Sequence, residues 1–292
     1  KRPLIILSFA GLINIGINLL LVIAFDMGVA GVAIGTTVSQ AISAVAVLWV
    51  LCRRKGYGKL RFGKLRIYGD TLKDIIRIGL PAGIQGTIFS LSNVIIQSSI
   101  NVFGDIAMAG NAAAANIEGF VYTAMNALSQ ACLTFTAQNY GANKLGNIRL
   151  ILAQCAGIVT VVGVVLGVAA YLCAAPLLSL YNGDAEVIRY GIDRLAIVST
   201  MYFLCGLMEV LVGSLRGMGR SLVPMILSVV GVCGGRVLWI YTVFAAEHNL
   251  TMLYLSYPVS WLLAIIMHLI TYFVVFKKVR GELSRPVDLN AA

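Results

Sequence analysis

Residues 79–146 read GLPAGIQGTIFSLSNVIIQSSINVFGDIAMAGNAAAANIEGFVYTAMNALSQACLTFTAQNYGANKLG, two long apolar segments joined by a short break. At helical spacing the first segment carries two polar stripes: Ser90, Asn93, Gln97 and Asn101, and then Gln85, Ser92 and Ser99. The second carries one polar face, formed by Asn111, Glu118, Tyr122, Ser129 and Thr136, with Asn126 at its edge. Because hydrocarbon offers no hydrogen-bond partner, such stripes must face protein or a water-filled cavity. The two helices are therefore predicted to wall a polar path through a membrane.

The composition of the whole chain is that of an integral membrane protein. Hydrophobic residues make up 59% of the 292 residues and charged residues 12%, with a mean hydropathy of +0.90, whereas soluble domains carry about 25% charged residues. A bilayer core takes about 20 apolar residues per helix. The predicted fold class is an all-α membrane protein of about eight transmembrane helices, at residues 4–25, 29–52, 75–103, 107–137, 148–174, 187–215, 221–245 and 250–276.

The net charge of +10 is concentrated on one side of the predicted membrane. Of the 22 Lys and Arg residues, all except Arg189, Arg194 and Arg236 lie on the side that also holds both chain ends. The positive-inside rule places that side, with both ends, in the cytoplasm. The charge is thus an orientation signal. We expect a multi-pass protein of the cell membrane, an inner membrane in bacteria, that contacts membrane lipids and no nucleic acid.

Two short motifs recur on spans of the same orientation. Ile6-Leu7-Ser8 followed by Gly11 returns as Ile226-Leu227-Ser228 followed by Gly231, and Val38-Ser39 returns as Val259-Ser260. The first two spans therefore correspond to the last two, as in transporters built from related halves. The predicted organisation is the last two helices of a first bundle at 1–52, a basic cytoplasmic linker at 53–74, a complete second six-helix bundle at 75–278 and a cytoplasmic tail at 279–292.

Glu118 and Arg236 are the ionisable residues deepest in the apolar pattern. Each is about eleven residues from the outer end of its span, near mid-depth at about 1.5 Å per residue. Because an unpaired charge there costs about 2.5–3.5 kcal/mol on insertion scales, the two side chains are predicted to pair. The pair is either a structural ion pair or a carboxylate for a coupling ion or cationic substrate that Arg236 tunes.

Other polar groups lie at less central positions. Glu209 is seven residues before Arg216 and is predicted to line a cytoplasmic-side vestibule or to contact a nearby arginine. His268 is predicted to be a buried, hydrogen-bonded core histidine, with proton relay as the alternative. Wall or packing hydrogen bonds are predicted for the amides of Asn14, Asn18, Gln85, Asn93, Gln97 and Asn126.

The sequence contains no constellation typical of an enzyme or a metal site. His248 and His268 fall toward opposite sides of the membrane, and Asp184 and Glu186 share a loop, so neither a metal site nor a Ser/His pair assembles from them. The six cysteines lack metal-ligand spacing and are read as small apolar packing residues. We therefore predict a protein that is not an enzyme and that uses no cofactor.

Several segments together carry a family resemblance: Gly79-Leu80-Pro81, Gln97 to Gly104, Asn116 to Phe120, Gln138-Asn139-Tyr140-Gly141-Ala142, and Leu215 to Gly219 with Pro224. In order and spacing they resemble the second half of multidrug and toxic compound extrusion (MATE) transporters. The Gln-Asn-x-Gly-Ala loop after a long helix of small residues is the most specific of them. The first two spans look like the last two helices of that family's first half, so the resemblance covers nearly the whole chain.

The resemblance implies a twelve-helix exporter with two six-helix bundles around a central cavity. Such an antiporter moves organic cations, drugs or other amphipathic solutes outward in exchange for H+ or Na+ by alternating access. This chain is expected to lack the first four helices, where many members carry an acidic coupling residue. It also has Phe89 where some members carry a Glu that builds a sodium site. The coupling ion is therefore left as H+ or Na+.

Tyr122 and Glu118 share a helix face and are the pair expected to contact a lipophilic cation through an aromatic ring and a carboxylate. The full set of substrate or coupling-ion candidates is Glu118, Tyr122, Asn126, Gln85, Asn93, Gln97, Arg236 and Glu209. One alternative is a lipid-linked saccharide or lipid flippase of similar architecture, which would need cationic side chains in its cavity and finds only Arg236. The other is a non-transporting membrane receptor or structural protein, which would bind ligand without counterflow of ions.

Overall fold

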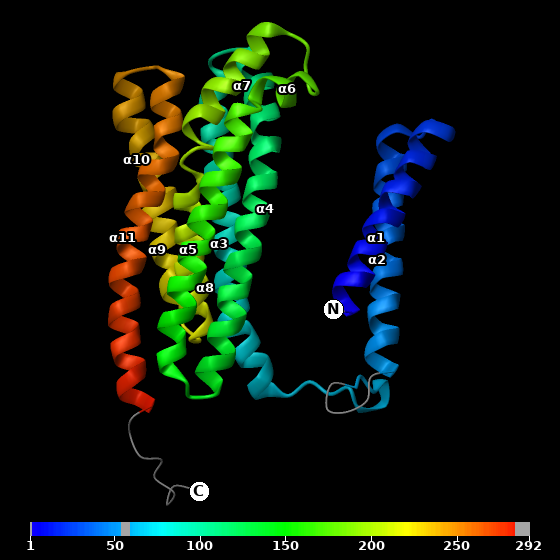
Figure 1. Ribbon diagram of the computed structural model, residues 1–292, viewed down its shortest axis with the longest axis vertical. Coiled ribbons are helices and arrows are strands. Elements are labelled where there is room, and N and C mark those ends of the chain that lie inside the picture. The colour runs from blue at the N-terminus through cyan, green and yellow to red at the C-terminus, as the bar shows by residue number, and fades with distance from the viewer. Residues whose placement is uncertain (1, 54–58, 284–292) are drawn as a thin grey trace, which may run out of the picture. The chain divides into compact units, whose positions relative to one another are not determined.

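The computed structural model describes residues 2–53 and 59–283, and the chain divides into two compact units, Lys1–Gly69 and Asp70–Ala292. The described parts of both units are helical (Figure 1). Residues 54–58 of the predicted linker and 284–292 of the predicted tail lie outside the described residues. The third helix begins at Gly69, earlier than the predicted residue 75, so the end of the predicted linker is helical.

The first unit is a helical hairpin with the elements α1 (Arg2–Leu19), the π-helical turn η1 (Leu20–Ala24), α2 (Gly28–Arg53) and the 3-10 turn η2 (Phe62–Lys64). Small residues of α2 face α1, and a Cβ at Gly35 would overlap the side chain of Asn18. Across the same contact Asn14 donates to the hydroxyl of Ser39 at 2.9 Å. Small residues and interhelical hydrogen bonds are the usual means of packing helices in a membrane.

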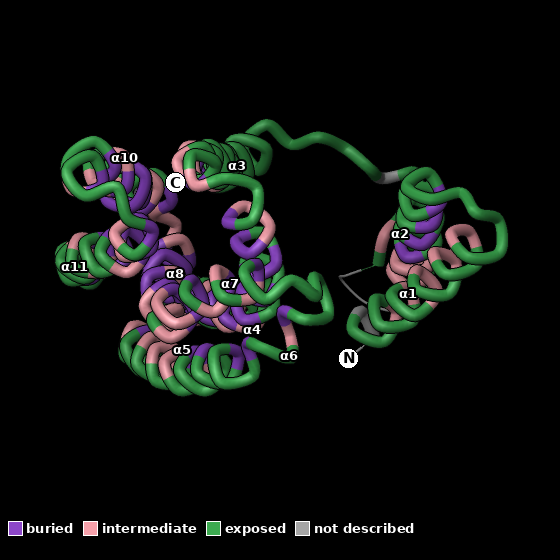
Figure 2. The backbone as a smooth tube through the Cα atoms, turned by 90° about the horizontal axis from the view of Figure 1, so that it is seen from above, coloured by how far each residue is buried: buried purple, intermediate pink, exposed green. Residues whose placement is uncertain are grey.

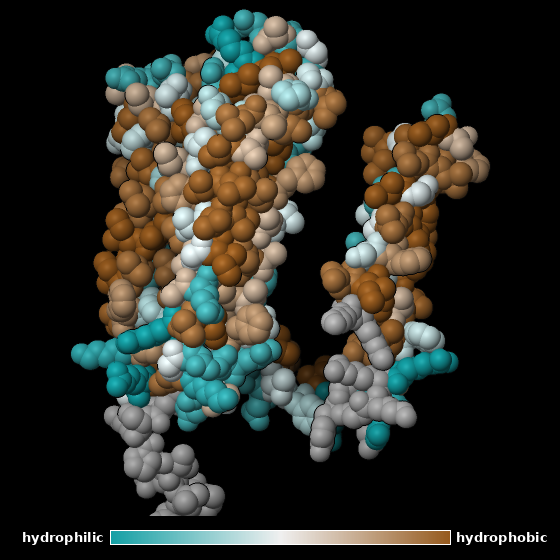
Figure 3. Space-filling view, in the orientation of Figure 1, coloured by the Kyte–Doolittle hydropathy of each residue, from teal (hydrophilic) through white to brown (hydrophobic). Residues whose placement is uncertain are grey.

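The second unit holds the remaining elements: α3 (Gly69–Asn101), α4 (Asp105–Gly141), α5 (Leu145–Leu172), α6 (Ala174–Ser179), α7 (Ala185–Ile197), α8 (Tyr202–Gly217), α9 (Leu222–Ser228), η3 (Val229–Gly234), α10 (Gly235–Trp239), η4 (Ile240–Phe244) and α11 (Leu250–Leu283). One end of this unit, the basic end, carries Lys144, Arg149, Arg216 and Lys277. The other, the acidic end, carries Asp105, Asp184, Glu186 and Glu247. Between the two ends, hydrophobic residues dominate the visible face of this unit (Figure 3).

The predicted all-α membrane class is confirmed. Within residues 2–53 and 59–283, six helices are long and apolar enough to cross a membrane, and a seventh is counted if the bent pair α7–α8 is one span. The predicted span at 107–137 corresponds to α4, a continuous helix of 37 residues. Amide and hydroxyl residues interrupt its apolar sequence. Pro81 lies inside α3.

Helix α4 is the central helix of the second unit and packs against α5, α7 and α8 (Figure 2). Its contact with α8 is close because glycines of α8 lie against the α4 backbone. A Cβ at Gly213 would come within 2.8 Å of the Ser129 carbonyl oxygen, and one at Gly217 within 2.8 Å of the Leu133 carbonyl oxygen. The hydroxyl of Ser129 also donates to the carbonyl of Glu209 at 2.8 Å. This contact fixes the side chains of α8 relative to those of α4.

The predicted span at 187–215 consists of two helices in the structure. α7 ends at Ile197 and α8 begins at Tyr202, with a bend of 50° between them. At the break, Ser199 donates to the carbonyl of Gly167 on α5 at 3.2 Å, and a Cβ at Gly167 would overlap the carbonyl oxygen of Ser199. The missing side chain of Gly167 therefore lets the irregular backbone pack directly on α5.

A second irregularity lies in the span from Leu222 to Phe244. Here the α-helical segment α10 is flanked by the π-helical turns η3 and η4. π-Helical turns are rare and occur frequently at functional sites. The five residues between these turns include Arg236, one of the predicted site residues.

Candidate functional site

The second unit contains a cavity of about 490 Å³ lined by residues of α3, α4, α7, α8, η3, α10 and α11. Of the residues predicted from the sequence, those that line it are Asn93, Gln97, Glu118, Tyr122, Glu209 and Arg236. Gln85 and Asn126 are not among the lining residues. The structure thus brings most of the predicted polar residues to one cavity, although they come from four different helices.

The polar stripe of α3 forms one wall of this cavity, as predicted. Ser90, Asn93 and Gln97 line it together with Phe89. Ser90 donates to the carbonyl of Gly86 at 3.1 Å, which is a local bond within the helix. Phe89, at the position where the family resemblance places a Glu in some members, contributes an aromatic ring and no charge.

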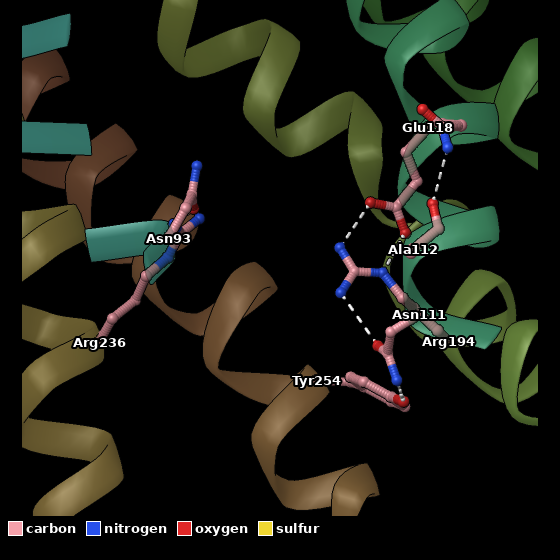
Figure 4. A network of polar contacts seen from close by, with 8 residues as sticks. Asn93, Asn111, Ala112, Glu118, Arg194, Arg236 and Tyr254 are labelled. Atoms are coloured by element: carbon pink, nitrogen blue, oxygen red, sulfur yellow. Dashed lines mark hydrogen bonds and ion pairs between the residues drawn. The ribbon is translucent and has the colours of Figure 1, made fainter. Parts of the chain in front are cut away.

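Glu118 is 4% exposed and pairs with Arg194, so the predicted pair with Arg236 is wrong. Arg194 Nε and Nη2 donate to the two oxygens of the Glu118 carboxylate, each at 2.9 Å (Figure 4). This two-pronged geometry is the strongest that an arginine and a carboxylate adopt. Depth in the membrane suggested Arg236 as the partner of Glu118. However, α7 begins at Ala185, and Arg194 lies far enough along this helix to reach Glu118.

The ion pair continues into a buried network that joins α4, α7 and α11. Arg194 Nη1 donates to Asn111 Oδ1 at 3.2 Å, and Asn111 Nδ2 donates to the Tyr254 hydroxyl at 2.8 Å. The guanidinium also lies 5.3 Å from the ring centroid of Tyr257. Glu118 and Asn111 were on the predicted polar face of α4, whereas sequence reasoning missed Arg194 and Tyr254.

Replacing Tyr254 by Phe tests the outer part of this network. We expect the free energy of unfolding to fall by about 1 kcal/mol, because the change removes one buried hydrogen bond and leaves the ring in place. Equilibrium unfolding of the detergent-solubilised protein measures the difference. Tyr181→Phe, at an exposed tyrosine, is the control, and equal stability of the two variants would contradict the expectation.

Arg236 lies on α10 and is 6% exposed. Its Nη1 donates to Asn93 Oδ1 at 3.0 Å (Figure 4) and its Nε donates to the Ser260 hydroxyl at 3.2 Å. The guanidinium carbon is 4.4 Å from the ring centroid of Tyr257. All three partners are neutral, and they hold the guanidinium at the cavity wall.

Glu209 reaches the cavity from α8, on the same helix face as Cys205 and Met208. Within the described part of the chain, no hydrogen bond or ion pair to its carboxylate is present. Arg216, two turns further along α8, is the basic side chain whose charge acts on this carboxylate. The predicted contact with an arginine is therefore not formed among the described residues, and the carboxylate faces the cavity.

The other predicted residues have distinct surroundings. Tyr122 lines the cavity with 38% of its surface exposed. Gln85 is buried and accepts a hydrogen bond from Arg216 Nη2 at 2.7 Å. Asn126 Oδ1 accepts from Gln130 Nε2 at 3.5 Å. Gln85 and Asn126 thus make packing contacts in this structure.

His268 is fully buried on α11, away from the cavity. Its Nε2 lies 2.9 Å from the hydroxyl of Ser228, which is also fully buried. This arrangement agrees with the prediction of a hydrogen-bonded core histidine. The contact joins α11 to α9 below the irregular segment that carries Arg236.

Comparison with known proteins identifies the family of this chain. The MatE family model matches residues 81–242. The chain is 23% identical over 240 residues to the probable multidrug resistance protein NorM of Thermotoga maritima, a match that covers 81% of this chain and 52% of that protein. It is 25% identical over 291 residues to the probable multidrug resistance protein YoeA of Bacillus subtilis, over 95% of this chain and 62% of that protein. The chain thus spans about half to three-fifths of the length of these relatives.

Solved structures share the fold. A crystal structure of MATE in complex with MaD5 matches with a TM-score of 0.84 and 17% identity, over 95% of this chain and 62% of that chain. The Vibrio cholerae MATE transporter VcmN in the bent form matches with a TM-score of 0.80 and 19% identity, over 94% of this chain and 62% of that chain. At these identities the likeness establishes the fold alone, whereas the family model covers more than half of the chain. The chain is therefore a multi-pass membrane protein that belongs to the MatE family of multidrug and toxic compound extrusion proteins.

Proposed function

We propose that this chain forms part of a secondary active efflux transporter, which exports organic cations, drugs or other amphipathic solutes across the cell membrane by alternating access. The observation that carries the proposal is the cavity in the second unit, a polar space within apolar helices with the carboxylate of Glu209 at its wall. A solute that crosses a membrane needs such a site, where polar groups replace its hydration. The names of the relatives, multidrug resistance proteins, support the same function.

Glu209 is the carboxylate that we assign to the coupling ion. Both oxygens of Glu118 accept hydrogen bonds from Arg194, whereas the carboxylate of Glu209 faces the cavity without such a partner. A metal cation in an oxygen site takes several ligands at once, but a proton needs a single carboxylate. The proposed coupling ion is therefore H+, with Na+ as the alternative. An ion bound there shifts the equilibrium between inward-open and outward-open states only by its difference in affinity for the two.

In the proposed orientation, the basic end of the second unit and both chain ends face the cytoplasm, because Lys and Arg residues are retained on that side. Solute enters the cavity from the cytoplasm or the inner leaflet and leaves at the acidic end. Membrane lipids contact the apolar band between the two ends.

Transport by the reconstituted product of the complete gene tests this function. We expect an imposed proton gradient to drive efflux of a rhodamine dye from liposomes, and Glu209→Gln to lower that efflux by about tenfold or more because the variant binds no coupling ion. A sodium gradient applied alone separates the two coupling ions.

The matched control is Glu186→Gln, at an exposed carboxylate of the acidic end that lies outside the cavity. Its efflux should stay within about twofold of wild type, since surface charge pairs contribute little. Full gradient-driven efflux by Glu209→Gln would remove Glu209 from the coupling step. Absence of efflux under both gradients would refute the transport function for this dye class.

A further inference from the structure

Four charged side chains line the cavity, and they fall into two groups. Glu118 and Arg194 form a two-pronged ion pair, so their charges compensate each other. Glu209 and Arg236 are different, because within residues 2–53 and 59–283 neither has an oppositely charged side chain at ion-pair distance. The cavity therefore offers one negative and one positive charge to a ligand.

Arg236 is a buried cation whose hydrogen-bond partners in the described part of the chain are neutral. It is 94% buried, and its bonds to Asn93 and Ser260 use Nη1 and Nε. A guanidinium has five N–H donors, and in the described part of the chain no bond from Nη2 is present. A buried cation with neutral partners alone is unfavourable in a membrane protein. A planar carboxylate from a bound solute matches the remaining donors and supplies the missing charge.

The walls near Arg236 are aromatic. Tyr257 lies beneath its guanidinium, and Trp261 packs edge-on against Tyr257 with ring centroids 5.8 Å apart. Trp261 also meets Tyr202 at 5.1 Å, and all three rings line the cavity. Such a surface accommodates the apolar body of an amphipathic solute while its charged groups reach polar partners.

We infer that the preferred solutes of this cavity are aromatic or amphipathic zwitterions, whose carboxylate binds Arg236 and whose cationic group binds Glu209. This inference rests on the proposed transport function and names the substrate class of the same cavity. A solute with a positive charge alone would satisfy Glu209 but would leave Arg236 uncompensated. The expected substrate class is therefore narrower than organic cations in general.

Two dyes that differ only in the anionic group test the inference. Rhodamine B carries a carboxylate and is a zwitterion at neutral pH, whereas its ethyl ester carries the positive charge alone. We expect the complete gene product, in phosphatidylcholine nanodiscs, to bind rhodamine B about tenfold more tightly than the ester, because charge-assisted hydrogen bonds to arginine are stronger than neutral ones. Fluorescence anisotropy at equilibrium gives both dissociation constants without any ion gradient.

Variants of Arg236 locate the effect. In Arg236→Gln the ratio of the two dissociation constants should fall to about one, and in Arg236→Lys it should lie between the two values, since lysine keeps the charge but lacks the planar fork. Arg189→Gln, at an exposed arginine outside the cavity, is the control and should keep the wild-type ratio. If Arg236→Gln does not fold, the wild-type ratio and Arg236→Lys still decide the question.

The outcomes separate this inference from the function on which it rests. Equal affinity of the wild type for the two dyes, or an unchanged ratio in Arg236→Gln, would overturn the zwitterion preference and leave the transport function standing. Failure to bind either dye would count against the cavity as a solute site, and so against both. Loss of rhodamine B binding in nanodiscs with phosphatidylglycerol would assign the anion site to a lipid headgroup and overturn the solute assignment.

Discussion

Glu118→Ala is expected to lower the free energy of unfolding by about 3–5 kcal/mol, because it leaves the guanidinium of Arg194 buried without a counter-charge. Arg194 is 5% exposed, and its remaining partners are Asn111 and the rings of Tyr254 and Tyr257. These groups are neutral and cannot replace a carboxylate. Equilibrium unfolding in mixed micelles compares the variant with wild type.

A double-mutant cycle separates the pair from its surroundings. Arg194→Met should also destabilise the protein, because it leaves the Glu118 carboxylate buried and unpaired. The double variant Glu118→Ala/Arg194→Met should lose much less than the sum of the single changes, since neither charge then remains. Additive losses would show that the two side chains contribute independently.

The control for this cycle is the exposed pair of Arg189 and Glu186 on α7. Their side chains are 65% and 56% exposed, and their closest atoms are 3.4 Å apart. Glu186→Ala should therefore change the free energy of unfolding by about 0–1 kcal/mol, the range of surface salt bridges. Comparable losses at Glu186 and Glu118 would contradict the role given to burial.

Gly167→Ala is expected to cost about 1–3 kcal/mol, as overpacking of a well-packed contact does. The added methyl would overlap the carbonyl oxygen of Ser199 and lie 3.6 Å from the Thr200 Cα, so α5 and the break between α7 and α8 must move apart. Because backbone blocks the methyl group, no side-chain rotation relieves the overlap. Gly167→Val should cost more than Gly167→Ala.

Gly157 on the same helix provides the matched control, since a Cβ there meets nothing within 4 Å. Gly157→Ala should change stability by at most about 0.5 kcal/mol. Thermal unfolding followed by circular dichroism measures both variants under the same conditions. If the two alanine variants are equally stable, the close contact between α5 and the break is not a constraint on the fold.

Most of the helical architecture followed from apolar run length, and the wall of the cavity followed from the polar stripe of α3. The break between α7 and α8 did not, because residues 197–202 contain neither glycine nor proline. The break is stabilised instead by contact with Gly167, which is remote in sequence. Tertiary contacts of this kind leave no local pattern.

The error in predicting the partner of Glu118 has a more specific cause. Arg194 is only seven residues into the predicted span at 187–215, and the depth argument compared Glu118 with Arg236 alone. The sequence nevertheless contains a signal for the start of α7. Asp184 is its N-cap residue and accepts a hydrogen bond from the backbone N–H of Glu186. A helix begun at Ala185 carries Arg194 inward by about 14 Å. Arg236 lines the same cavity as Glu118 but pairs with Asn93 and Ser260. Depth does not choose among side chains from different helices.

The two π-helical turns around α10 affect the direction in which the side chain of Arg236 points into the cavity. A π turn accommodates one more residue than an α turn, and one residue corresponds to a rotation of about 100° around the helix axis. The azimuth of Arg236 is therefore set separately from that of Ser228, which bonds His268 before η3, and from that of Phe244, which meets the Phe103 ring at 6.2 Å at the end of η4. A residue removed from one turn together with a residue added to the other would rotate Arg236 around the helix axis while both anchoring contacts keep their positions. The direction in which Arg236 points can therefore change without a change in the helix contacts of Ser228 and Phe244.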